Sequence, residues 1–140
     1  MQRVELTPGR WADLRHVNNS VNERIGYVPD LAQYGRAEQW AIVRGHGAGD
    51  CDDYALTKGE SLRALGWPLD VLDIATCRLR TGEGHAVLVV RASEDGKPVD
   101  YVLDNLTDGI WRWDQKPYDW IEITVGGSLM HWEKIPETTS

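Results

Sequence analysis

The spacing of apolar residues changes its period near the middle of the chain, and this change constrains the fold more than any other feature. Before it, apolar residues recur at intervals of three and four, as one face of a helix requires: Trp11, Leu14, Val17 and Val21. From Leu69 onwards, runs rich in Val, Ile and Leu are typical of strands. Helices first and strands afterwards predict an α+β domain, with helices packed on an antiparallel sheet.

A second helix begins at Asp50, and its ends are marked by residues of the expected types. Asp50 is a suitable N-cap, and Asp53 follows three residues later, an acidic variant of the capping-box spacing. Gly66 stands where a left-handed residue closes a helix, and Pro68 prevents any extension. The sequence therefore predicts a helix between Asp50 and Gly66.

The remaining segments are a short helix, a glycine-rich loop and a series of strands. We expect the helix over residues 30–40, the loop over 44–49, and strands over 69–79, 86–92, 101–103, 110–113, 120–125 and 129–134. The segment 94–98 contains Asp-Gly and predicts a hairpin loop between the second and third strands. All of these segments fit one domain over residues 1–140.

Composition excludes several classes of function. The chain of 140 residues has a formal net charge of −7 and a sequence pI near 5.0, and it has no run of basic residues for a nucleic-acid backbone. Its longest apolar stretch, residues 85–90, is far shorter than a membrane span. The first residues have no apolar core of the signal-peptide type, which makes the cytoplasm one candidate, but the residue pattern does not decide the compartment.

The two cysteines have different surroundings. Cys77 lies in a strand-like segment and is most simply a small buried residue. Cys51 lies in the first turn of the second predicted helix, where unpaired backbone N–H groups and the helix dipole stabilise a thiolate. A zinc site using both cysteines with His85, and with His46 as a further candidate ligand, is an alternative, but no pair has the usual ligand spacing. Cys51 is therefore the candidate nucleophile.

His85 and Asp104 complete a candidate triad. His85 opens the most apolar strand, and Asp104 ends the next one, so the two are expected to approach as cross-strand neighbours. A carboxylate at one ring nitrogen keeps the other nitrogen free to take the thiol proton. A cysteine at a helix start, together with His and Asp on paired strands, predicts acyl transfer, although Asp104-Asn105 could also simply begin a turn.

Three segments carry a resemblance to a known family. They are Asp50-Cys-Asp-Asp-Tyr-Ala55, Gly84-His-Ala-Val-Leu-Val-Val90 and Val102-Leu-Asp-Asn105, with Val17-Asn18 and Trp40 upstream. Together they resemble the bacterial transglutaminase-like cysteine proteinases over about residues 11–113. The resemblance implies a papain-like fold and the triad Cys51, His85 and Asp104.

The same resemblance implies further residues and partners. LapG-like members of the family are periplasmic, calcium-dependent proteases, in which acidic residues beside the nucleophile help to bind the ion. Asp50 and Asp52 stand at those positions, although plain helix capping also explains Asp50. Gln39 is a candidate side-chain donor to the oxyanion. The resemblance thus implies the periplasm, whereas the residue pattern leaves the compartment open.

The function expected from these features is hydrolysis of peptide bonds in a protein or peptide substrate, through an acyl-enzyme on Cys51. The chemistry needs no cofactor, with calcium as a possible addition at Asp50 and Asp52. Transfer of the acyl group to an amine is one alternative, and a non-catalytic peptide-binding module on the same fold is another. The sequence leaves the oligomeric state open.

Overall fold

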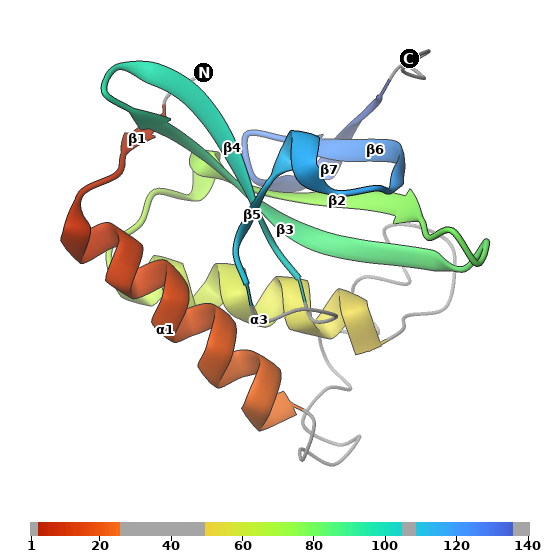
Figure 1. Cartoon of the computed structure of the whole chain (residues 1–140), viewed down its shortest axis with the longest axis horizontal. Coiled ribbons are helices and arrows are strands. Elements are labelled where there is room, and N and C mark those ends of the chain that lie inside the picture. Colours follow the sequence, from red (N-terminus) through yellow and green to blue (C-terminus); the bar gives the residue numbers. More distant parts are fainter. Residues whose placement is uncertain (1–2, 26–49, 105–108, 136–140) are drawn as a thin grey trace.

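The computed structural model describes residues 3–25, 50–104 and 109–135, and of residues 24–25 and 50–54 it describes the backbone alone. Two helices, α1 (Pro8–Ile25) and α3 (Asp50–Ala64), pack against each other and lie on one side of a β-sheet (Figure 1). No described helix has the length and apolar character needed to cross a bilayer.

The sheet has the order β5-β4-β3-β2-β6-β7, and β1 pairs in parallel with the end of β3. Its strands are β1 (Val4–Glu5), β2 (Leu72–Arg78), β3 (Gly84–Glu94), β4 (Lys97–Leu103), β5 (Trp111–Arg112), β6 (Asp119–Val125) and β7 (Ser128–Lys134). Every pairing on the main path is antiparallel. The predicted α+β fold is confirmed.

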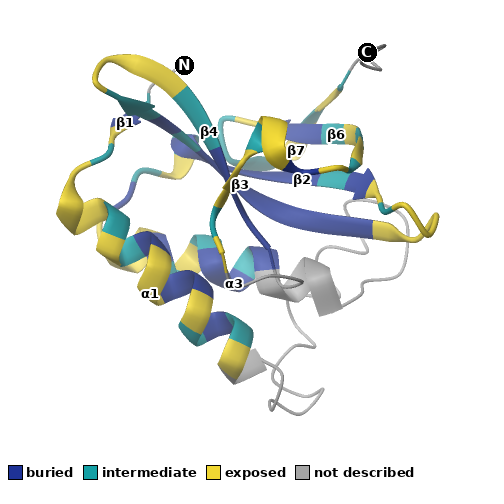
Figure 2. Ribbon diagram, viewed as in Figure 1, coloured by how far each residue is buried: buried dark blue, intermediate teal, exposed yellow. Residues whose placement is uncertain are grey.

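The core has two parts because successive residues of a strand point to opposite faces of the sheet. On the helix side, Leu88 and Leu103 pack with the apolar stripe of α1, which buries Leu14, Val17 and Val21 as its spacing predicts. On the other side, a smaller cluster gathers aliphatic and aromatic residues: Ala75, Val87, Val89, Val102 and Ile123, with Trp113, Tyr118 and Trp120 against them. The central strands β2 and β3 are consequently buried along most of their length (Figure 2).

Most predicted boundaries hold, and the differences have local causes. The helix α3 ends at Ala64, followed by Gly66 with φ of 98°. The predicted strand 69–79 begins only at Leu72, because a 3-10 turn, Leu69–Val71, follows Pro68. The predicted strand 110–113 is shortened to β5 by the 3-10 turn Trp113–Gln115.

The hairpin between β3 and β4 is tighter than predicted. Its loop consists of Asp95 and Gly96 alone, with φ of 53° and 77°. Two central residues with positive φ are typical of a type I′ turn, whose twist matches that of the flanking strands. β3 and β4 therefore extend to the turn itself. The helix predicted over 30–40 and the loop predicted over 44–49 lie outside the described residues.

Candidate active site

His85 and Asp104 contact each other on the face of the sheet that points away from the helices. Nε2 of His85 lies 2.8 Å from Oδ1 of Asp104, and both side chains are buried. The contact is diagonal, because Asp104 follows the last pair of β3 and β4, Leu88 with Leu103, by one residue, whereas His85 precedes it by three. On its other side, His85 is directly opposed by Cys77 of β2. Asp104 is thus the first residue after β4, placed where its side chain reaches back to the start of β3.

This contact determines which ring nitrogen of His85 can act as a base. An ionised carboxylate only accepts hydrogen bonds, so opposite an ionised Asp104 the hydrogen of this contact is carried by Nε2 of His85. A neutral imidazole has one protonated and one unprotonated nitrogen. The unprotonated nitrogen of a neutral His85 is then Nδ1.

The second carboxylate oxygen of Asp104 also has partners. Oδ2 accepts a hydrogen bond from the Tyr118 hydroxyl at 2.5 Å and lies 3.3 Å from Nζ of Lys116. The backbone carbonyl of Asp104 accepts from Nδ2 of Asn22 at 3.0 Å. Asp104 is thus held through its carboxylate and its backbone by residues from three parts of the chain.

An aromatic ring contacts the imidazole and is the first of three aromatic rings that pack on one another. The Tyr118 ring meets the His85 ring edge to face, with centroids 5.6 Å apart, and Tyr118 packs in the same way on Trp120. Trp113 stacks on Trp120 with centroids 3.7 Å apart. Burial raises the pKa of Tyr118 well above its usual range, and the hydrogen bond to Asp104 raises it further. Tyr118 therefore remains a protonated donor at neutral pH.

Cys51 lies in the first turn of α3, together with Asp50 and Asp52. α3 packs against β3, and its first turn lies at the same end of the molecule as the start of β3, which carries His85 (right in Figure 1). The side chains of Cys51, Asp50 and Asp52 are outside the description, and so is the whole of Gln39. Within the described part of the chain, no group of three or more His, Cys, Asp or Glu side chains could hold a metal ion.

Sequence reasoning missed Asn22, Lys116 and Tyr118. Lys116 and Tyr118 follow the 3-10 turn Trp113–Gln115 and precede β6, in a segment without periodic spacing. Asn22 lies on the helix predicted from its apolar stripe, but the stripe does not indicate which polar residue reaches Asp104. The one signal in the sequence is the spacing of Lys116 and Tyr118. Residues i and i+2 of an extended segment share a side, so these two side chains can reach the same group.

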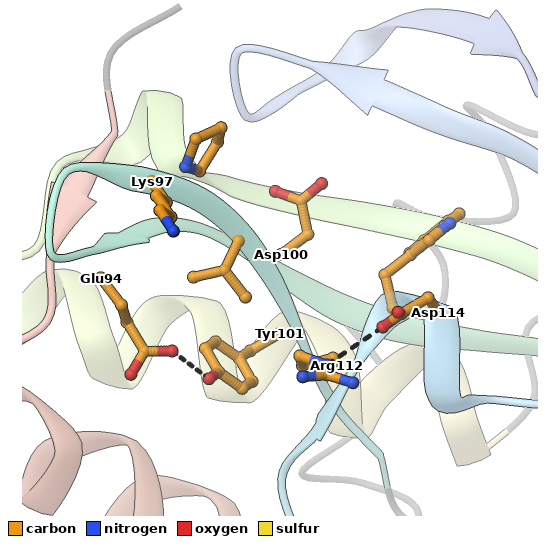
Figure 3. Close-up of a pocket in the computed structure, with 9 residues that line it drawn as sticks. Glu94, Lys97, Asp100, Tyr101, Arg112 and Asp114 are labelled. Carbon is orange, nitrogen blue, oxygen red and sulfur yellow. Dashed lines mark hydrogen bonds and ion pairs between the residues drawn. The ribbon is translucent and has the colours of Figure 1, made fainter.

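A separate cavity of about 510 Å³ lies along β4, towards its beginning and away from Asp104. Figure 3 shows its charged and aromatic lining, in which Tyr101 donates a hydrogen bond to Glu94 and Arg112 pairs with Asp114. None of the residues that line this cavity belongs to the candidate triad.

Comparison with known proteins gives a consistent result. The family model for bacterial transglutaminase-like cysteine proteinases matches residues 1–140. The solved structure of calcium-bound LapG from Legionella pneumophila is similar, with a TM-score of 0.58 and 26% identity over 85% of this chain and 66% of LapG. EGTA-treated LapG gives a TM-score of 0.57 and 26% identity, covering 85% of this chain and 64% of LapG.

The chain thus spans slightly less than two thirds of the length of LapG. A comparison with curated proteins gave no match. The match of the family model to the whole chain, together with the likeness to LapG, shows that this protein belongs to the bacterial transglutaminase-like cysteine proteinases.

Proposed function

We propose that the chain is a cysteine peptidase in which Cys51 is the nucleophile, His85 the general base and Asp104 the orienter. The observation that carries the proposal is the buried contact of 2.8 Å between His85 and Asp104. It is supported by the position of Cys51 in the first turn of α3 and by membership of a cysteine proteinase family.

The proposed reaction has two halves. Nδ1 of His85 takes the proton of the Cys51 thiol, and the sulfur attacks the carbonyl carbon of a peptide bond. The oxyanion that forms accepts a hydrogen bond from the backbone N–H of Cys51 at the helix end, and the imidazolium gives its proton to the leaving amine. A water molecule, deprotonated by His85, then attacks the thioester and releases the acid and the thiol.

Alkylation tests the nucleophile, because the two cysteines serve as each other's control. Brief treatment with iodoacetamide at about pH 6, followed by peptide mass spectrometry, is expected to modify Cys51 well before the buried thiol of Cys77. His85→Ala is expected to abolish this preference. Slow and equal labelling of both thiols would favour a peptide-binding module without catalysis.

A second assay tests the acceptor of the acyl group. Purified protein and its Cys51→Ser variant are incubated with a protein substrate mixture, with and without a fluorescent primary amine. New peptide termini that depend on Cys51 support hydrolysis. Incorporation of the amine without cleavage would instead identify a transamidating enzyme.

We also propose that Asp50 and Asp52 contribute to a calcium site beside Cys51. Carboxylate oxygens are ligands that Ca²⁺ prefers, and both residues lie in the first turn of α3. Two carboxylates provide only part of the six to eight oxygen ligands that Ca²⁺ takes, so further oxygen atoms are needed. LapG has been solved both bound to calcium and after EGTA treatment. Such an ion would supply positive charge close to the nucleophile.

Thermal unfolding with calcium or with EGTA tests this site. Calcium is expected to raise the melting temperature of the wild type, since a ligand that binds the folded state stabilises it. Asp52→Asn is expected to remove this increase, whereas Asp114→Asn, on the exposed 3-10 turn after β5, is expected to keep it. If calcium does not change the melting temperature of the wild type, the proposed calcium site is ruled out.

A further inference from the structure

The two carboxylate oxygens of Asp104 have separate partners. Oδ1 contacts His85, whereas Oδ2 contacts Tyr118 and Lys116. We propose that Lys116 and Tyr118 are positioning residues that keep Asp104 ionised and oriented, so that it accepts a hydrogen bond from Nε2 of His85. The inference rests on the proposed function, because it explains how His85 is prepared to act as a base.

The orientation of the carboxylate follows from donors on both oxygens. A carboxylate that contacted His85 alone could turn about its terminal torsion, which is broad for Asp. The Tyr118 hydroxyl at 2.5 Å and Nζ of Lys116 at 3.3 Å restrain Oδ2 and so keep Oδ1 directed at the imidazole. Tyr118 also contacts the His85 ring edge to face, so it positions both members of the pair.

The charge of Asp104 requires compensation because the side chain is fully buried. The ammonium of Lys116, itself only 4% exposed, supplies the opposite charge. Without it, burial would favour the protonated carboxylic acid. A protonated Asp104 could donate its hydrogen to Nε2 of His85, which would move the imidazole hydrogen to Nδ1, so that Nδ1 could no longer act as the base.

The groups that face His85 determine which of its ring nitrogens carries the hydrogen. Asp104 and Tyr118 contact the ring, Cys77 of β2 is its directly opposed strand partner, and Lys116 acts through Asp104. Of these four, Lys116 is the one with a positive charge. Its removal is therefore expected to change the balance between the two neutral tautomers of His85.

The local backbone explains how one short segment supplies both partners of Oδ2. The backbone N–H of Lys116 donates to the carbonyl of Trp113 and closes the 3-10 turn, and Lys116 itself is extended, with φ of −86° and ψ of 126°. Pro117 fixes its own φ near −65°. Residues 116 and 118 then point to the same side, as successive odd or even residues of an extended chain do.

Two residues elsewhere in the chain provide matched controls for Tyr118 and Lys116. Tyr101 is buried and also donates its phenolic hydrogen to a carboxylate, that of Glu94, but in the separate cavity along β4. Tyr101→Phe therefore removes the same kind of bond at a site remote from His85. Lys97, exposed at the β3–β4 turn, is the corresponding control for Lys116.

The experiment combines two measurements on the full chain. Long-range ¹H–¹⁵N NMR of protein labelled at histidine nitrogen reports the tautomer of His85, assigned by loss of its signals in His85→Ala. Steady-state kinetics on a peptide cleaved by the wild type report kcat and KM separately. The variants are Lys116→Met, Lys116→Gln, Lys116→Arg and Tyr118→Phe, with Lys97→Met and Tyr101→Phe as controls.

We expect Nε2–H in the wild type and in both controls. Lys116→Met is expected to shift His85 towards Nδ1–H and to lower kcat on the order of 100-fold, since the wrong tautomer disables a base of this kind. KM should change by less than about twofold, as for an interaction needed only in the transition state. Lys116→Arg should restore Nε2–H and most of kcat, and Tyr118→Phe should lower kcat about 3- to 10-fold with the tautomer unchanged.

Lys116→Gln keeps a hydrogen-bond donor but loses the charge. If Lys116→Met does not fold, Lys116→Gln tests the inference in its place. The inference is overturned if folded Lys116→Met or Lys116→Gln retains both the Nε2–H tautomer and wild-type kcat. A wild type that cleaves no peptide, yet shows the tautomer change on loss of Lys116, would instead contradict the proposed function and leave the positioning of His85 established.

Discussion

The side-chain amide of Asn22, near the end of α1, donates a hydrogen bond to the backbone carbonyl of Asp104 across 82 positions of the chain, at 3.0 Å. Asp104 is fully buried, and it directly follows the last residue of β4. Helix α1 therefore helps to fix the point at which the chain leaves β4, and with it the direction in which the Asp104 side chain projects.

Asn22→Ala is expected to weaken both stability and activity. Loss of the donor leaves the Asp104 carbonyl without this hydrogen bond in a buried position, which costs about 1–3 kcal/mol. Movement of Asp104 should also lower kcat by roughly tenfold. Urea unfolding and steady-state kinetics measure the two effects. Asn19→Ala, at an exposed position of the same helix, is the matched control and should change neither.

Asp73 is the centre of a buried polar network that joins β2 to β3, β6 and the following turn. One of its carboxylate oxygens accepts from the Thr124 hydroxyl and the Gly127 N–H, both at 2.7 Å, and the other pairs with Arg91 at 3.0 Å. Arg91 pairs in turn with Asp100. Like Asp104, Asp73 is therefore a buried carboxylate that several partners hold in place.

Asp73→Ala is expected to lower the free energy of unfolding by about 3–5 kcal/mol, because it removes one partner from a buried ion pair and orphans two donors. Asp114→Ala provides the contrast. Its partner Arg112 is about half exposed, and so exposed a pair should contribute less than about 1 kcal/mol. Urea unfolding measures both variants. An equal loss of unfolding free energy in the two would contradict the idea that the buried pair contributes more than the exposed one.

Gly127 has a positive φ of 75° and lies against the backbone of Leu69, where an added Cβ would stand 2.2 Å from the Leu69 carbonyl oxygen. Gly126 has a φ of 60° but open space around it. Gly126→Ala should therefore cost only the backbone strain, about 1–2 kcal/mol. Gly127→Ala should cost about 1–3 kcal/mol more, because a backbone clash cannot be relieved by a change of rotamer. Thermal or urea unfolding of the two variants gives the comparison.

Burial, together with the hydrogen bond to Glu94, raises the pKa of Tyr101 to about 12. The folded state thus prefers the neutral phenol more strongly than the unfolded state does. This contribution to stability is complete below the usual tyrosine pKa of about 10 and is lost as the pH rises from there through about 12.

The ultraviolet absorbance of tyrosinate measures this titration. The wild-type curve minus that of Tyr101→Phe should show one phenol that ionises near pH 12. Glu94→Gln removes the carboxylate and should move this step to lower pH. A difference curve centred near pH 10 would contradict the burial of the Tyr101 hydroxyl.

Local residue patterns were sufficient for the elements that form locally. Gly66 and Pro68 marked the end of α3 because a helix ends where its own backbone cannot continue, and Asp95-Gly96 marked the hairpin because the turn needs two residues of positive φ. The expectation that His85 and Asp104 approach each other needed only two adjacent strands and a tight turn between them.

The tertiary structure alone decided what surrounds that pair. Asn22 reaches Asp104 only because α1 packs on the sheet, and Lys116 and Tyr118 reach it only because an aperiodic segment folds back over the second core. Contacts of this kind depend on how separate elements pack against one another. The local spacing of residues does not predict that packing. The sequence by itself determined the α+β order and the candidate nucleophile, base and orienter, whereas packing determined the residues that hold the orienter in place.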